Sequence, residues 1–143
     1  RKNMSSHIIT TTWKGNMQFE STNPGGSLII DAAEEVGGTN DGLRPKALML
    51  SALAGCSGLD VASLIKKMRL DVVDFNIVTE GHLTDTEPQV YDKVQVVYHF
   101  YGPNLNEEKL ARAVELSVDK YCGVMHMFRS FSDVTIDIVY HRN

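Results

Sequence analysis

The chain has 143 residues, of which 43% are hydrophobic and 22% charged, and its formal net charge is −4 at pH 7. This length fits a single domain, residues 1–143, that can bury a core of its own. The acidic balance argues against nucleic acid as a partner, because nucleic-acid binders usually carry a basic face. The residues up to Trp13 lack the apolar stretch of a signal peptide. With no export signal predicted and two cysteines, the chain is expected to be cytoplasmic, where thiols stay reduced.

The first third of the chain is expected to form a small sheet. Strands bounded by turn residues are predicted at 7–13, 17–20 and 27–31. Gly15-Asn16 supplies a tight hairpin turn between the first two strands, with Gly in the first central position. A Pro-Gly-Gly break at 23–26 precedes the third strand. The glycine-rich stretch 35–44 is expected to be a loop.

Pro45 opens the strongest predicted helix, because proline suits the first helical position, where its missing N–H is not needed. The helix is expected to end near Arg69, with basic side chains at its carboxyl end. It is apolar nearly all round, so it is expected to be buried on most sides. Residues 47–65 are the only candidate membrane span, but Asp60, three serines and two glycines favour a buried core helix. No membrane association is therefore predicted.

Alternating apolar residues predict three further strands. Their inward-facing residues are expected to be Val73, Phe75 and Ile77, then Val94, Val96, Tyr98 and Phe100, and finally Val134, Ile136, Ile138 and Tyr140. A helix from about residue 106 to 120 lies between the last two, capped by Asn104 or Asn106. The buried stripe of this helix is expected to be Leu110, Ala113, Val114, Ser117, Val118 and Tyr121.

The order of these elements predicts an α+β fold, because strands and helices do not alternate regularly as in a doubly wound sheet. One small sheet can cover only one side of the apolar helix that starts at Pro45. A second copy of the chain is the simplest source of the missing cover, and symmetric dimers are the commonest oligomers. A homodimer is therefore expected.

Cys56 lies in the middle of that helix, beside Gly55 and close to Gly58. A glycine inside a helix costs about 1 kcal/mol relative to alanine, so something should offset the cost. One interpretation is tight helix packing around an inert, buried thiol. The other is a thiol that small neighbours keep accessible for chemistry.

Cys122 follows the second helix, and Gly123 can end that helix and let a new one begin. A thiol at a helix amino end has its thiolate favoured by the dipole and the free N–H groups. His126 lies one turn further on and could activate the thiol or bind a metal with it. Two ligands do not make a zinc site, so neither a metal nor a cofactor is expected. Asp60 needs a partner if buried, and Lys46, Lys66 and Arg129 are the candidate bases.

The stretch from Pro45 through Gly55-Cys56 to an acid four places later, Asp60, resembles the central-helix signature of the OsmC/Ohr-like family. Tyr121-Cys122, after an amphipathic helix, resembles that family's second cysteine segment. The order of strands and helices agrees over nearly the whole chain. The resemblance implies small antiparallel sheets around a long buried central helix in an intertwined homodimer, with two sites at the subunit interface.

The resemblance also implies a chemistry of hydroperoxide defence, a stress response. Cys56 would attack an organic hydroperoxide or hydrogen peroxide and become a sulfenic acid. Cys122 would then close a disulfide, which an external dithiol reductant would reopen. The alternative is a non-peroxidase OsmC-like protein that binds a small apolar or thiol-reactive ligand at the dimer interface.

One departure from the family pattern bears on this choice. The peroxidase branches carry a glutamate directly after the proline and an arginine in the amino-terminal strands, and this pair positions the first thiolate. Here the matching residue is Lys46, and residues 7–35 contain no arginine. A Lys46 ammonium near Cys56 would lower the thiol pKa, but the ten intervening helical steps span about 15 Å. The chain is therefore interpreted as a less characterised branch without the Arg–Glu pair.

Overall fold

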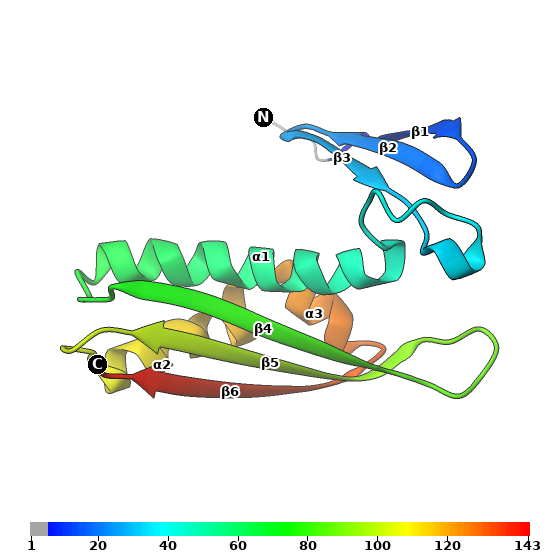
Figure 1. The fold of residues 1–143 in the computed structure, drawn as a ribbon. Helices are drawn as coiled ribbons and strands as arrows, with labels where there is room; N and C mark the ends of the chain where they lie inside the picture. The colour runs from blue at the N-terminus through cyan, green and yellow to red at the C-terminus, as the bar shows by residue number, and fades with distance from the viewer. Residues whose placement is uncertain (1–5) are drawn as a thin grey trace. The chain divides into compact units, whose positions relative to one another are not determined.

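The computed structural model describes residues 6–143 as an α+β fold. Its elements are β1 (Thr10–Gly15), β2 (Gln18–Asn23), β3 (Gly26–Ile30), η1 (Glu34–Val36), α1 (Pro45–Lys67), β4 (Asp74–Leu83), β5 (Tyr91–Tyr101), α2 (Glu107–Leu116), η2 (Ser117–Tyr121), α3 (Gly123–Arg129) and β6 (Asp133–His141). Figure 1 shows these elements along the chain. They form two compact units, one up to Leu48 and one from Met49 onward, which are described separately below.

The first unit contains an antiparallel sheet in the order β1-β2-β3, so the three predicted strands are confirmed. The hairpin turn lies one residue later than predicted. Gly15 still pairs with Gln18 after a register shift, and the two connecting residues are Asn16 and Met17. Asn16 takes a φ of +50°, a left-handed conformation that asparagine tolerates better than most residues. Gly15, at φ +105°, supplies the bend at the register shift instead of the first turn position.

The stretch predicted as a loop is organised around the buried carboxylate of Asp31. One oxygen of Asp31 accepts the Thr39 hydroxyl at 2.7 Å and the Asp41 N–H at 3.1 Å. The other accepts the Ala32 N–H at 2.7 Å. These bonds, led by that of Thr39, lower the Asp31 pKa to about 2. These hydrogen bonds to the Asp31 anion fix the conformation of the loop, which has no sheet or long helix to do so.

Helix α1 begins at Pro45, as predicted, and ends at Lys67, two residues before the predicted end. Arg69 adopts a left-handed φ of +56°. The N–H of Leu70 then donates to the carbonyl of Ile65 at 2.9 Å, which closes the helix in the manner of a Schellman motif. Glycine usually occupies such a position, so no sequence signal marked this helix end.

The second unit contains a sheet in the order β4-β5-β6. Strands β4 and β5 pair antiparallel, but β5 and β6 pair parallel. The expectation of antiparallel sheets is therefore wrong for this pair. The reason is the long helical connection through α2, η2 and α3, which carries the chain back to the end of the sheet where β5 begins, as parallel pairing requires.

The inner face of this sheet forms the core of the second unit. Val94, Val96, Tyr98 and Phe100 are buried on β5, as their alternation predicted. The predicted inward residues of β6 pack against the same cluster, as do Phe75 and Ile77 on β4. The prediction is wrong for Val73, which precedes β4 and is 72% exposed. Asn106, one of the two proposed caps, accepts the Lys109 N–H at 3.1 Å and so caps α2.

Helix α1 has one buried stripe within the single chain, formed by Leu53, Ser57 and Val61. Its other faces are open, and Leu59 is 76% exposed. By length and composition, this is the one helix of residues 6–143 that could cross a membrane, and 17% of its most apolar window is buried. The expectation of burial on most sides is thus not met by one copy of the chain, because the sheet covers a single stripe.

Candidate thiol site

The two thiols lie together in the second unit. Cys56 is half-buried on α1, and Cys122 is buried, with 4% of its surface exposed, between η2 and α3. Cys56 packs against the apolar cluster that contains Cys122. Both are free thiols. The two residues predicted as a redox pair are therefore adjacent in the structure.

A π-helical turn sets the direction of Cys122. The N–H of Cys122 donates to the carbonyl of Ser117 at 2.8 Å, five residues back. This wider turn, η2, shifts the residues that follow it relative to the stripe of α2. Tyr121 was expected in the buried stripe, but it is 51% exposed, and Cys122 takes the inward position instead. π-turns of this kind are frequent at functional sites.

Cys122 also caps α3, because its sulfur accepts the Met125 N–H at 3.3 Å. The sequence predicted that this helix end would favour the thiolate, and the Met125 N–H does act in that direction, but burial outweighs it. Burial raises the pKa of Cys122 to about 11, helped by the hydrogen bond with Cys56 and by the negative charge of Asp60. The Met125 N–H acts in the opposite direction but is the weaker effect.

Asp60 finds a hydroxyl partner. Its Oδ2 accepts the Ser117 hydroxyl at 3.0 Å. Ser117 Oγ in turn lies 2.7 Å from Ser57 Oγ, which lies 2.6 Å from the Tyr98 hydroxyl. Of the candidate bases, Arg129 instead donates to Val118 O and Asp119, and the side chains of Lys46 and Lys66 are exposed.

This chain of hydroxyls was not predicted. The signal was present, because Ser57 and Ser117 each occupy a buried position on a helix, where an apolar residue is the rule. Tyr98 was predicted only as a core ring, but its hydroxyl ends the chain of hydrogen bonds. Polar residues at buried positions require partners, so they could have been read as one network.

A pocket of about 250 Å³ adjoins Cys122. The residues that line it are Val118, Asp119, Lys120, Tyr121, Cys122, Gly123, His126 and Arg129. His126 is exposed there, and its backbone N–H donates to the Cys122 carbonyl at 3.1 Å. Within residues 6–143, no three or more His, Cys, Asp or Glu side chains are grouped to hold a metal. Cys122 lines this pocket, whereas Cys56 does not.

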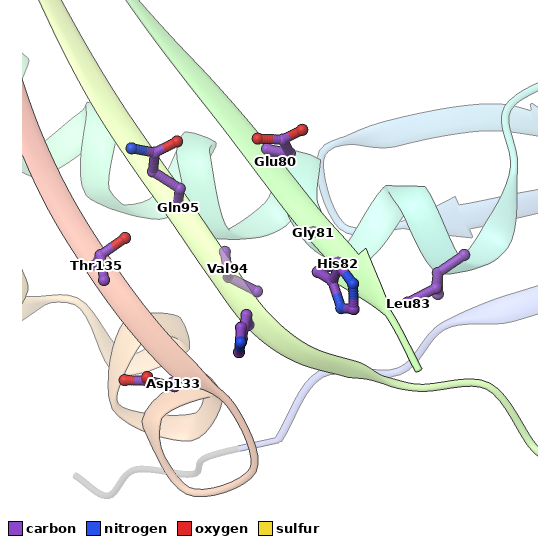
Figure 2. A pocket seen from close by; sticks show the side chains of 9 residues that line it. Glu80, Gly81, His82, Leu83, Val94, Gln95, Asp133 and Thr135 are labelled. Atoms are coloured by element: carbon purple, nitrogen blue, oxygen red, sulfur yellow. The ribbon is translucent and has the colours of Figure 1, made fainter. Parts of the chain in front are cut away.

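A larger pocket, about 430 Å³, lies on the β4-β5-β6 sheet, away from the thiols. Figure 2 shows the side chains that line it, among them Glu80, His82 and Gln95. Gln95 pairs in register with Glu80 on one side and Thr135 on the other, at positions that alternate with the buried ones. The pocket is therefore on the outer face of the sheet and contains no thiol.

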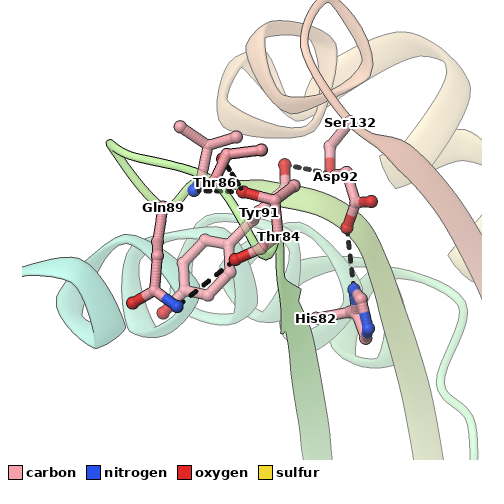
Figure 3. Close-up of polar contacts among 8 residues, drawn as sticks. His82, Thr84, Thr86, Gln89, Tyr91, Asp92 and Ser132 are labelled. Atoms are coloured by element: carbon pink, nitrogen blue, oxygen red, sulfur yellow. Dashed lines mark hydrogen bonds and ion pairs between the residues drawn. The ribbon is translucent and has the colours of Figure 1, made fainter.

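Polar contacts continue beside this pocket, where β4 meets β5 (Figure 3). His82 Nδ1 donates to Asp92 Oδ1 at 2.9 Å, and this bond lowers the pKa of the Asp92 carboxyl. Ser132 Oγ donates to the Tyr91 carbonyl at 2.9 Å. Both His82 and Asp92 are well exposed, so this pair has the character of a solvated surface contact.

The fold and the thiol pair agree with a known family. The family model described as OsmC-like protein matches residues 38–137, a span that includes both cysteines. The chain therefore belongs to the OsmC-like protein family.

Individual relatives bear out this assignment. Protein YhfA of Escherichia coli K12 is 33% identical over 91 residues, which cover 64% of this chain and 68% of YhfA. A solved structure of a hypothetical protein from Aquifex aeolicus VF5 is 28% identical, with a TM-score of 0.83, over 96% of this chain and 97% of that one. The organic hydroperoxide resistance protein OsmC of Legionella pneumophila is 17% identical, with a TM-score of 0.69, over 96% and 98%. At that identity, the last likeness concerns the fold alone.

Proposed function

We propose that this chain is a cysteine-based peroxidase that reduces organic hydroperoxides through Cys56 and Cys122. The observation that carries the proposal is that two free thiols meet in one apolar cluster, with Cys56 packed against the cluster that contains Cys122. The name of the Legionella structure, an organic hydroperoxide resistance protein, supports the choice of substrate class.

The reaction assigns a separate task to each thiol. The Cys56 thiolate attacks the terminal oxygen of the hydroperoxide, the O–O bond breaks, and the alcohol leaves with a proton. Cys122 then attacks the sulfur of the resulting sulfenic acid. The S–O bond breaks, water leaves with the proton of Cys122, and a disulfide forms. An external dithiol supplies two electrons and two protons to restore both thiols.

A thiol count tests this proposal. Reduced protein is treated with one equivalent of cumene hydroperoxide, with hydrogen peroxide alongside, and its free thiols are titrated. We expect both thiols to disappear together, and Cys122→Ser to leave a sulfenic acid that dimedone traps. Cys56→Ser should keep its remaining thiol. Unchanged thiols in the wild type after treatment would refute the peroxidase proposal.

A binding function is the second candidate, and a pocket in the first unit favours it. This pocket is about 340 Å³ and is lined mostly by apolar residues, among them Met17, Phe19, Ile30 and Val36. Lys46, in place of the family's glutamate, also favours binding over peroxidase chemistry. Calorimetry with an apolar ligand such as a fatty acid would support this function, provided that the thiols stay unreactive toward hydroperoxide.

We propose in addition that the working form is a homodimer. The open faces of α1 carry large apolar side chains, and Leu59 is 76% and Met49 43% exposed. Obligate interfaces bury about 2,000 Å² or more in total. A second copy of the chain would bring an identical apolar helix to cover these faces. Sedimentation at micromolar concentration should give a dimer, and a well-folded monomer would exclude it.

A further inference from the structure

Four polar side chains form one hydrogen-bonded chain in the core of the second unit. It runs from the Tyr98 hydroxyl to Ser57 at 2.6 Å, from Ser57 to Ser117 at 2.7 Å, and from Ser117 to Asp60 at 3.0 Å. Tyr98, Ser57 and Ser117 are each 0% exposed. A buried hydroxyl without a partner costs stability. Each hydroxyl in the chain therefore keeps its hydrogen bond to the next, which restricts the positions of both side chains.

The carboxylate at one end fixes the direction of the chain. A carboxylate only accepts hydrogen bonds, so the single proton of Ser117 is directed to Asp60. The Ser57 hydroxyl must then donate to Ser117, and the Tyr98 hydroxyl must donate to Ser57. The Ser117 hydroxyl also lies 3.4 Å from the Ser57 carbonyl, a second contact with the segment that carries Cys56.

The central link of this chain joins the two cysteine segments. Ser57 follows Cys56 directly on α1, and the carbonyl of Ser117 accepts the N–H of Cys122 at 2.8 Å. The Ser57–Ser117 bond therefore ties the backbone that carries one thiol to the π turn that presents the other. The Tyr98 link is different, because it ties the Cys56 segment to β5 and makes no contact with the segment that carries Cys122.

We infer that Ser57 and Ser117 are positioning residues that hold Cys56 and Cys122 at the separation needed for disulfide closure. This inference rests on the proposed peroxidase function, in which Cys122 attacks the sulfenic acid of Cys56. A disulfide tolerates only a narrow range of separations, with Cα atoms about 4.4–6.8 Å apart. Fixing both segments in advance raises the effective concentration of one thiol at the other.

Stability alone does not account for the network. Apolar side chains of similar shape at all buried positions would leave stability nearly unchanged. The sequence instead has two serines on helices that are otherwise apolar at their buried positions. The gain from the network is a defined geometry. The non-local bonds that it adds between helical segments, Ser117 to Ser57 and Ser117 to Asp60, both join the two cysteine-bearing segments.

The test measures the disulfide directly. Wild type and Ser117→Ala are equilibrated in a glutathione redox buffer, and the ratio of disulfide to dithiol is read by mass spectrometry. We expect Ser117→Ala to lower the equilibrium constant for disulfide formation by about tenfold, because effective concentration is lost. After one equivalent of cumene hydroperoxide, the same variant should give more dimedone-trapped sulfenic acid than the wild type.

Two controls separate positioning from general stability. Thr79→Val removes a buried hydroxyl outside the network, which has no hydrogen-bond partner among the described residues, and should leave the disulfide equilibrium unchanged. Tyr98→Phe removes one network hydroxyl but keeps the Ser57–Ser117 link, so its effect should be under about threefold. Should Ser117→Ala fold poorly, Asp60→Ala instead removes the acceptor that orients the Ser117 hydroxyl, and Asp60→Asn, which keeps an acceptor oxygen, should restore the wild-type disulfide equilibrium.

The inference is overturned if Ser117→Ala keeps the wild-type equilibrium constant and the wild-type sulfenic acid yield. It is equally overturned if Ser117→Ala and Tyr98→Phe weaken the disulfide in proportion to their losses of unfolding free energy. The glutathione arm needs no hydroperoxide. A wild type that ignores hydroperoxide, with a weaker disulfide in Ser117→Ala, would therefore refute the peroxidase function and leave the positioning role standing.

Discussion

The raised pKa of Cys122 makes a measurable prediction about its reactivity. The pKa lies near 11, compared with an ordinary value of 9.0, chiefly because the thiol is buried. Thiolate is the reactive form, so at neutral pH ionisation alone makes Cys122 about a hundredfold less reactive than an exposed thiol. Replacing Cys56 by alanine removes the smaller causes, the hydrogen bond and the charge of Cys56. It should therefore lower the Cys122 pKa only part of the way.

The assay is alkylation by iodoacetamide between pH 7 and pH 11, with the modified peptides resolved by mass spectrometry. Burial slows alkylation at every pH, but it does not change where the rate levels off. We expect the logarithm of the Cys122 rate to rise steadily beyond pH 10 in the reduced wild type. A plateau at or below pH 9 would refute the reasoning. Rates that are unchanged in low urea would confirm that the native state is being sampled.

The same shift has a consequence for folding stability. In the unfolded chain Cys122 loses its proton near pH 9.0, whereas in the folded chain it keeps the proton until about pH 11. The unfolded state therefore binds fewer protons between these values, and the free energy of unfolding falls as the pH rises through this window. The contribution is fully present below pH 9, and its loss amounts to less than about 2.7 kcal/mol. Urea denaturation of wild type and Cys122→Ser at pH 8 and pH 11 measures it.

Three substitutions test the fold around the site by thermal and urea unfolding. Arg69→Gly should raise the unfolding free energy by about 1 kcal/mol, because Arg69 caps α1 at a positive φ that glycine adopts without strain. Ala62→Gly, at an exposed position inside the same helix, should lower the unfolding free energy by a similar amount. Gly81→Ala should cost about 1–3 kcal/mol, because the new Cβ would lie 2.6 Å from the Tyr91 ring. Thr79→Val should gain about 1 kcal/mol by removing a buried hydroxyl that lacks a partner in residues 6–143, and a loss there would show that water satisfies it.

Much of the fold could be predicted because its signals are periodic. The alternation of Val94, Val96, Tyr98 and Phe100 marks one face of a strand, whichever way the strand runs. That same property explains the error at β6, because alternation carries no information about direction. The parallel pairing follows from the length of the helical connection between β5 and β6.

The site was harder to predict than the fold. The apolar spacing of α2 predicts a regular helix through residue 121. The structure has one wider, π-helical turn there, η2, which breaks that spacing. A regular helix would bury Tyr121, which is in fact exposed. The sequence marks Cys122 as the end of a helix, but it does not show that Cys122 is buried. Motif likeness identified which two thiols meet, but the pKa of Cys122 depends on how deeply it lies, and local sequence does not specify depth.

The environment of Cys122 bears on the proposed order of the reaction. A thiol that stays protonated up to about pH 11 is a poor first nucleophile at neutral pH. In the proposed cycle Cys122 reacts only in the second step, when the adjacent Cys56 carries a sulfenic acid, which is an electrophile. The first attack in the proposed cycle must therefore come from Cys56, which is the more accessible of the two. Residues 7–35 lack the family's arginine, and Lys46 is the group proposed to take its place. Lys46→Ala tests that group directly, because an unchanged Cys56 alkylation rate from pH 6 to pH 9 would exclude Lys46 and favour the binding function.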